Sequence, residues 1–419
     1  MKLKSILIKS CLIVSYTLLL TGCYDMSETD KRAYVVGIGL DKAEEEGSIK
    51  VTYLIANPEV GSQQSGGNAN EPPLEVISFD ANDFMVSRNI ANAVIAKEIT
   101  YDILNVLLVS EELARDKDFI RWMYQATKDR EIRRDIYFVV TRESAFEYIQ
   151  SNNPKLETRP HKYFELIIQR GIQTSLIPNS DLNRYFKITE ADADLFLSIL
   201  TSLQKDQEQL NRKKDDEFIA GDIRFEGETS KTQFIGSAVF KQGKMVGTLT
   251  GEETRFSFLL NQANGKSSDM LTTFPIPENE TYRLTARLQK RKNIKMKMDL
   301  KNKKPKIDVT LPLKVEILSD PLMVSYPKDK EKLEELRLFL EDRIESKMEN
   351  LVKKTQEEFG TDPFGWSLYA RKEFLTLKQW EEFDWMKSYP DMEINIHVDI
   401  RFGPFGRQGK LPSLDAIRD

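Results

Sequence analysis

The sequence lacks most of the residue patterns that enzymes and metal sites need. It has two Cys and two His among 419 residues. His161 and His397 are too far apart in the chain for an HExxH site or a closely spaced metal-binding pair. No GxSxG elbow, P-loop, CxxC pair or EF-hand loop occurs, and Gly37-Ile38-Gly39 lacks the third glycine of a dinucleotide-binding motif. These absences disfavour a zinc hydrolase and catalysis in general, and we expect no metal and no cofactor.

The composition is that of a folded protein with several domains. The chain is 40% hydrophobic, 10% aromatic and 30% charged, which supplies enough apolar material for packed cores. A length of 419 residues indicates two or three domains. Beyond the N-terminal region, no stretch approaches the roughly 18 consecutive apolar residues that a membrane-spanning helix needs.

The N-terminus carries the most specific local signal. Three lysines, at positions 2, 4 and 9, precede an apolar run of eleven residues, 10–20, which ends in Leu20-Thr21-Gly22-Cys23. The run is too short for a comfortable bilayer crossing, and a basic start followed by a short apolar region is typical of a signal peptide. Leu-Thr-Gly-Cys resembles the lipobox of bacterial lipoproteins. This resemblance implies cleavage between Gly22 and Cys23, with diacylglycerol on the thiol and an N-acyl chain on the new N-terminus.

Cleavage would change the charge and the thiol content of the mature chain. Residues 1–22 contain three of the 61 basic residues and no acid, so 58 basic residues would face 66 acidic ones, a formal charge of −8. This balance disfavours nucleic acid as a partner. Cys11 would be lost with the signal peptide and Cys23 would carry lipid, which leaves no cysteine pair for a disulfide. Two acyl chains suffice for stable membrane attachment, so we expect an extracytoplasmic protein that is tethered to the membrane and does not span it.

Hydrophobic periodicity predicts several mixed α/β domains, an α+β fold class, after a tether at 23–32. Residues 33–203 alternate strand and helix patterns, beginning with a hairpin of 33–40 and 49–56, and form the predicted N-terminal mixed α/β domain. A polar loop, 57–73, follows that hairpin. A charged linker near 204–217 opens a predicted strand-rich middle domain, 204–289, with a hairpin of 234–240 and 245–249.

The predicted C-terminal α+β domain, 290–419, has the clearest periodicity. Apolar residues alternate with polar ones over 294–300, 307–317 and 394–400, which predicts three half-buried strands. Leucines and other apolar residues recur at helical spacing over 328–359, which predicts a long amphipathic helix. A second helix is predicted over 364–387.

Two surfaces of this domain have alternative interpretations. Nine basic residues lie within the seventeen positions 290–306, and Lys295 and Lys297 fall on the polar side of a predicted strand. They form a candidate membrane or partner surface, although a solvated strand face is the favoured interpretation. The aromatic series from Trp366 to Phe383, with Trp385 nearby, has helical spacing and is interpreted as core in preference to a docking face. His397 is predicted to be exposed and without a catalytic role.

Several short motifs, in order along the chain, resemble the Ger(x)C family. They are Leu20-Thr21-Gly22-Cys23 with Tyr24-Asp25, the segment from Val36 to Lys42, Gly236-Ser237-Ala238-Val239-Phe240 with Met245-Val246-Gly247, and Asp362-Pro363-Phe364-Gly365. The family comprises lipoprotein C subunits of nutrient germinant receptors in endospore-forming bacteria.

The resemblance implies a non-enzymatic subunit on the outer face of the inner spore membrane. Its implied partners are two multi-spanning subunits, of A and B type, and its implied role is receptor assembly and signal coupling. Only Cys23 carries over as a functional residue. The alternative is an extracytoplasmic ligand-binding lipoprotein of a transporter, for which a cleft between domains would be the site. Such proteins have two similar lobes, and the sequence contains no internal repeat of that kind.

Overall fold

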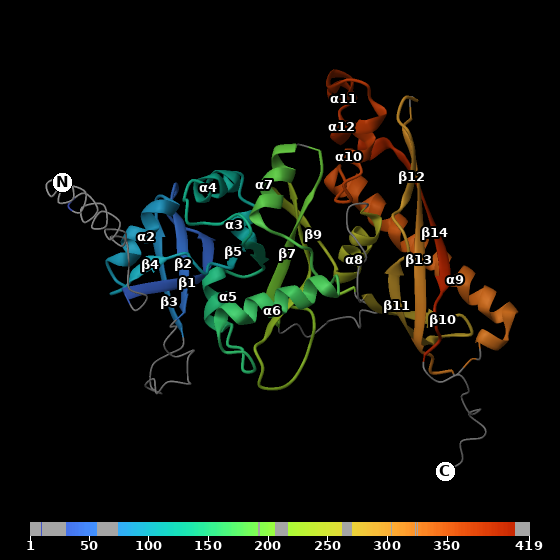
Figure 1. The fold of residues 1–419 in the computed structure, drawn as a ribbon, viewed down its shortest axis with the longest axis horizontal. Helices are drawn as coiled ribbons and strands as arrows, with labels where there is room; N and C mark the ends of the chain where they lie inside the picture. The colour runs from blue at the N-terminus through green and yellow to red at the C-terminus, as the bar shows by residue number, and fades with distance from the viewer. Residues whose placement is uncertain are drawn as a thin grey trace, which may run out of the picture.

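The structure is a computed structural model that describes residues 31–56, 74–205, 217–261 and 270–406, apart from positions 192, 303, 323 and 325, together with the single position 10. Two β-sheets lie side by side along the long axis of the molecule (Figure 1). The first is built from strands within residues 32–249 and the second from strands within residues 270–402. This confirms the predicted mixture of helices and sheets.

The first sheet has nine strands in the order β3-β2-β1-β5-β6-β7-β8-β9, with β4 paired to β1. The strands β1, β5, β6 and β7 are parallel, whereas the pairs at both ends are antiparallel. The two predicted hairpins are confirmed as β1–β2 and β8–β9. The strand bounds are β1 (Arg32–Lys42), β2 (Ile49–Ala56), β3 (Leu74–Ala81), β4 (Glu98–Thr100), β5 (Val106–Ser110), β6 (Tyr137–Thr141), β7 (Phe196–Leu203), β8 (Thr232–Lys241) and β9 (Lys244–Leu249).

Helices cover both faces of this sheet, as expected for parallel strands that are buried on two sides. One face packs against α2 (Phe84–Asn92), α3 (Glu111–Ala114), α4 (Phe119–Ala126) and α7 (Leu182–Ala191). The other packs against α5 (Ala145–Ser151) and α6 (Pro160–Gln173). On the first face, the rings of Phe138, Tyr185 and Phe240 contact one another at centroid distances of 5.1 to 5.8 Å, so α7 is held firmly on the sheet.

The second sheet has five strands in the order β10-β11-β13-β12, with β14 on the other side of β13. Their bounds are β10 (Met270–Ile276), β11 (Asn279–Lys290), β12 (Lys295–Asp299), β13 (Lys306–Ser319) and β14 (Glu393–Phe402). The long helix α9 (Lys330–Lys354) packs on the apolar face, where Ile344 and Met348 are fully buried. The predicted strand alternation and the predicted long helix are confirmed.

The outer edge of β14 is protected by side chains of α9. A Glu345 carboxylate oxygen accepts a hydrogen bond from the Val398 N–H at 2.6 Å, and Glu341 accepts one from the Ile400 N–H at 2.9 Å. Unpaired edge N–H groups invite pairing with another strand, so these two carboxylates satisfy donors that the sheet leaves open.

The helix α8 (Gly251–Leu260) lies between the two sheets (Figure 1). A capping box of Thr250 and Glu253 fixes its start. Its buried side chains belong to one core that also contains β8 and β9 residues and the apolar face of the second sheet. The two sheets are therefore joined by a continuous apolar contact.

The sheets divide the chain differently from the predicted domain boundaries. The described residues of the segment 204–289, predicted as a middle domain, form no sheet of their own. Its strands β8 and β9 extend the first sheet from β7, whereas β10 and β11 belong to the second sheet. Hairpin patterns identify local strand pairs but carry no information about the sheet that a hairpin joins, because that choice depends on contacts far apart in the sequence.

The predicted helix over 364–387 is wrong. The segment forms three short helices, α10 (Ser367–Ala370), α11 (Leu377–Phe383) and α12 (Trp385–Ser388). A capping box of Thr376 and Gln379 starts α11, and Asp384, with φ of 47°, ends it in the left-handed region. The remaining short elements are 3₁₀ turns at Tyr326–Lys328, Arg371–Glu373 and Tyr389–Asp391 and a π-helical turn at Thr355–Phe359.

Candidate functional site

The predicted lipid attachment site lies outside the described residues. This applies to Gly22, Cys23 and the tether up to position 30, and also to the polar loop 57–73. The first described segment leads directly into β1, at the end of the first sheet that lies farthest from the second sheet (Figure 1).

Lys295 and Lys297 lie on β12 with exposed side chains, as predicted. The strand register places Lys297 opposite Asp308 on β13. A hydrogen bond from Asn395 lowers the pKa of the Asp308 carboxyl, and the positive charges of Lys306, His397 and Lys297 lower it further. Within the described part of the chain neither Lys295 nor Lys297 forms an ion pair. Both lysines are open cations on this sheet face.

Other members of the basic segment 290–306 are not part of that open face. Lys290 is buried, its Nζ donates to the Asn261 carbonyl at 2.5 Å, and burial lowers its pKa to about 8. Arg291 pairs with Asp399 at 2.5 Å and Lys306 with Glu393 at 2.9 Å. The nine basic residues are therefore not one surface, because the pleat and the ion pairs separate them.

The histidines and the aromatic series behave as predicted. His397 is exposed on β14, and His161 is half-buried on α6, where burial lowers its pKa. Trp366 and Trp385 are buried in the core, with Phe374, Trp380 and Phe383 packed against it. The core interpretation of the aromatic series is confirmed.

A loop from the C-terminal part of the chain, 359–366, forms hydrogen bonds to the residues just before β7 of the first sheet. The Leu195 N–H donates to the Asp362 carbonyl at 2.8 Å, and the Thr361 hydroxyl donates to the Ala193 carbonyl at 2.6 Å. Farther along the loop, the Trp366 indole N–H donates to the Leu260 carbonyl at the end of α8, at 3.0 Å. We call this contact region the seam. It holds the two sheets in one relative position.

Two carboxylates meet at the seam, the fully buried Asp362 and the half-buried Asp194, and the sequence analysis assigned no role to either. Asp362 Oδ1 accepts from the backbone N–H groups of Phe364 and Trp366 at 2.8 and 3.3 Å, and its Oδ2 accepts from the Trp385 indole at 3.1 Å. Burial, and next the negative charge of Asp194, raise the pKa of Asp362. Burial also raises the pKa of Asp194, which the Ser367 hydroxyl partly offsets. The signal available in the sequence was the Asp362-Pro363-Phe364-Gly365 motif, in which a carboxylate caps a tight loop.

These raised pKa values predict a pH dependence of stability. Above about pH 4 these two carboxyls bind more protons in the folded state than in the unfolded state, so their contribution to the free energy of unfolding decreases as the pH rises through the raised values. We expect the wild-type protein to lose stability between about pH 5 and about pH 7.5, and Asp194→Asn to lose less because asparagine stays neutral. Urea unfolding at several pH values measures this difference.

The matched control is Asp135→Asn, which neutralises a carboxylate that is 72% exposed. It should leave the pH slope of the wild type unchanged. Equal slopes for all three proteins would contradict the assignment of raised pKa values at the seam. The unfolding measurements should stay below about pH 8, because the lowered pKa of Lys290 makes stability rise with pH above that value.

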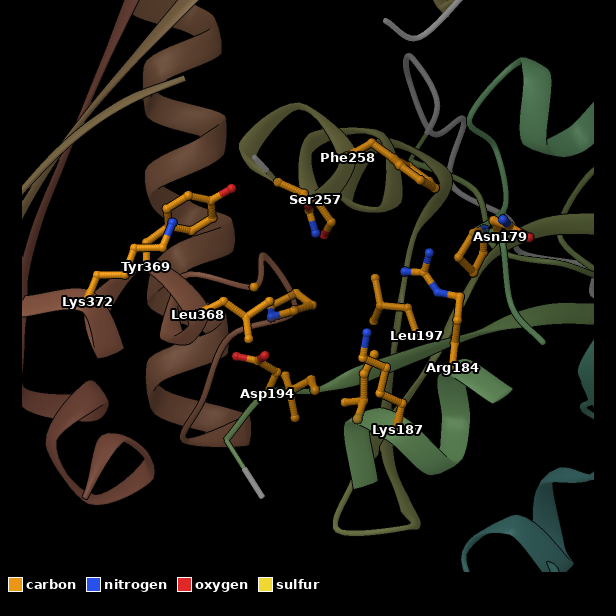
Figure 2. A pocket seen from close by; sticks show the side chains of 16 residues that line it. Asn179, Arg184, Lys187, Asp194, Leu197, Ser257, Phe258, Leu368, Tyr369 and Lys372 are labelled. Carbon is orange, nitrogen blue, oxygen red and sulfur yellow. The ribbon is translucent and has the colours of Figure 1, made fainter. Parts of the chain in front are cut away.

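A cavity of about 500 Å³, which we call the inter-sheet cavity, opens beside the seam. One wall of the cavity is formed by α7 and the start of β7, and the opposite wall by the segment 363–372 (Figure 2). Residues of α8 also line it. Arg184 and Lys187 of α7 lie on one side of it, while Tyr369 and Lys372 lie opposite. Asp194 lines it as well. Sequence analysis missed this site because its walls come from segments that are up to about 190 residues apart in the chain.

The described part of the chain has neither a metal-binding cluster nor a membrane-spanning helix. In it, no group of three or more His, Cys, Asp or Glu side chains could hold a metal ion. No helix among the same residues is long and apolar enough to cross a bilayer.

Comparisons with known proteins match nearly the whole described chain. Residues 25–202 match the family described as "Spore germination protein N-terminal domain", and residues 235–406 match "Spore germination B3/ GerAC like, C-terminal". Spore germination protein B3 of Bacillus subtilis (strain 168) is 21% identical over 397 residues, which are 94% of this chain and 96% of that protein. Spore germination protein KC of the same organism is 25% identical over 148 residues, 34% of this chain and 36% of that protein.

A solved structure shares the fold. The "Crystal Structure of the GerBC protein" has a TM-score of 0.51 and 16% sequence identity, covering 90% of this chain and 99% of that chain. One family match covers most of the first sheet and the other runs from β8 through the second sheet, in the same order as the quoted motifs. This chain belongs to the Ger(x)C family of spore germination proteins.

Proposed function

We propose that this chain is the lipid-anchored, non-enzymatic C subunit of a spore nutrient germinant receptor. The observation that carries the proposal is the pair of consecutive family matches, supported by relatives named spore germination proteins B3, KC and A3. The proposed role is receptor assembly and signal coupling. The low content of catalytic motifs in the sequence supports a role without chemistry.

Cys23 is the proposed attachment point to the outer face of the inner spore membrane. A diacylglycerol group on its thiol and an acyl chain on its amino group would hold the folded part next to partners that cannot leave the bilayer. Confinement raises the effective concentration of a weakly binding subunit at its partners without any new contact. The proposed partners are the two multi-spanning A and B subunits.

The direct experiment is purification of the lipidated protein from detergent-solubilised spore inner membranes, with mass spectrometry of whatever accompanies it. Recovery with two multi-spanning subunits is the expected result. Recovery alone, or with an ATP-driven transporter, would overturn the proposal in favour of a ligand-binding lipoprotein of a transporter.

The open lysines of β12 are the proposed contact with a partner or with the membrane. Reversing both charges, Lys295→Glu with Lys297→Glu, should lower recovery of the two membrane subunits about tenfold. The new glutamates would repel the acidic groups that the lysines would attract in such a contact. Quantitative mass spectrometry of the purified complex measures this loss. Both side chains are exposed, so the fold should tolerate the change.

A second double variant, Lys128→Glu with Lys155→Glu, is the matched control. It reverses two exposed charges on the first sheet's side of the molecule, so it makes the same change in net charge at another place. Full assembly with both double variants would remove the β12 face as a docking surface.

A further inference from the structure

The inter-sheet cavity contains polar atoms whose hydrogen bonds the protein does not complete. Arg184 Nε and Asp194 Oδ1 are both shielded from solvent, and neither has a hydrogen-bond partner in the structure. Both residues line the cavity. A buried polar atom without a hydrogen-bond partner destabilises the folded state. Buried polar atoms at an interface that serves only for packing normally have hydrogen-bond partners. Two atoms without partners at one cavity therefore indicate that these groups bind a ligand.

The positive groups define one side of the cavity. Arg184 and Lys187 are three residues apart on α7, which places them on the same helical face. Figure 2 shows both on the same side of the cavity. Lys372, opposite, has its Nζ 4.5 Å from the centre of the Tyr369 ring. Three cations face a single carboxylate, Asp194, so the cavity favours an organic anion.

The apolar part of the lining limits the kind of anion. Leu197, Phe258 and Leu368 line the same cavity, and Figure 2 shows Leu368 between Lys372 and Arg184, with Leu197 beside Arg184. A volume of about 500 Å³ lies within the usual range for small-molecule sites, which combine an apolar lining with a few placed polar groups. An inorganic anion would leave this apolar surface uncovered, whereas a molecule with a hydrocarbon skeleton would bury it.

We propose that the inter-sheet cavity binds a small organic acid that has an apolar skeleton and one hydrogen-bond donor. The carboxylate of the ligand pairs with Arg184 and Lys187, and its donor, a hydroxyl or an ammonium group, bonds to Asp194 Oδ1. The hydrocarbon part packs on Leu197, Phe258 and Leu368. Because the walls come from both sides of the seam, bound ligand connects the two sheets. This site is independent of the lipid anchor and of the proposed receptor partners.

The test uses the full lipidated chain in detergent and a matched set of ligands, measured by isothermal titration calorimetry. Two of them, 2-hydroxy-4-methylpentanoate and L-leucine, carry both groups. Of the other two, 4-methylpentanoate lacks the donor and 4-methylpentan-2-ol lacks the carboxylate. At least one of the first two should bind about tenfold more tightly than either incomplete ligand, a difference of about 1.4 kcal/mol, since each incomplete ligand lacks one charged hydrogen bond.

Variants separate a ligand contact from a structural effect. Asp194→Asn should weaken the preference for a ligand with a donor, because the amide oxygen accepts without a charge, and should keep the preference for a carboxylate. Arg184→Gln should do the reverse. Arg133→Gln, at a side chain that is 57% exposed, is the control and should change neither preference. Binding of no member of the set, or preferences that both cavity variants leave intact, would overturn the proposal.

Discussion

Replacing Cys23 by alanine is expected to abolish most of the response to the cognate nutrient in a strain that lacks other receptors. The substitution removes the thiol that would carry diacylglycerol, so the exported chain would no longer be held by two acyl chains. Loss of membrane confinement lowers partner occupancy on the order of 10²-fold for a weak contact. Loss of optical density in a spore suspension after nutrient addition measures the response, and fractionation of spore membranes measures attachment.

The neighbouring substitution Tyr24→Ala is the control for this prediction. It changes the mature N-terminus next to the cysteine but keeps the thiol, so attachment and response should stay near the wild-type level. Fusing residues 24–419 to an unrelated single-span anchor should restore the response, if confinement is what the lipid provides. A Cys23→Ala protein that stays in the membrane fraction and supports a normal response would contradict the anchor assignment.

Replacing Trp366 by alanine is expected to cost about 3–5 kcal/mol of unfolding free energy. The side chain is fully buried, its ring contacts Phe364 at a centroid distance of 4.6 Å, and its indole N–H donates to the Leu260 carbonyl. The substitution leaves a cavity at the seam and leaves that carbonyl without its donor. Typical domains have only about 5–15 kcal/mol in total, so such a loss should be large in urea unfolding followed by circular dichroism.

Leu375→Ala is the matched control in the same segment. Leu375 is 94% exposed, so its truncation should change the free energy of unfolding by less than about 0.5 kcal/mol. Trp366→Phe should fall between the two, because it keeps an aromatic ring and loses the N–H donor. Equal effects of Trp366→Ala and Leu375→Ala would show that the seam contributes little to stability.

These predictions depend on the sequence to different degrees. The Cys23 prediction follows from the local motif Leu20-Thr21-Gly22-Cys23, whose chemistry depends only on adjacent residues. The Trp366 prediction needed the structure for its partner, because Leu260 is more than a hundred residues away in the chain. Helical spacing placed Trp366 in the core correctly, but it could not show that the same tryptophan joins two sheets.

Local pattern determined much of the fold. Alternation over 307–317 and 394–400 is a property of the strand backbone, whose side chains point to opposite faces in turn, and both segments are strands in the structure. The periodicity of 328–359 likewise corresponds to α9. The same reasoning failed over 364–387, where the capping box of Thr376 and Gln379 interrupts a run of aromatic residues with helical spacing.

The sequence by itself determined the signal-peptide pattern, the scarcity of catalytic motifs, the strand and helix periods and the resemblance to Ger(x)C proteins, because each depends on neighbouring residues or on the order of short motifs. Only the tertiary structure decided that β8 and β9 complete the first sheet, that Asp194 and Asp362 meet at the seam, and that Arg184 and Asp194 line one cavity. Strand partners, burial and cavities arise from contacts between distant segments, and local periodicity does not encode those contacts.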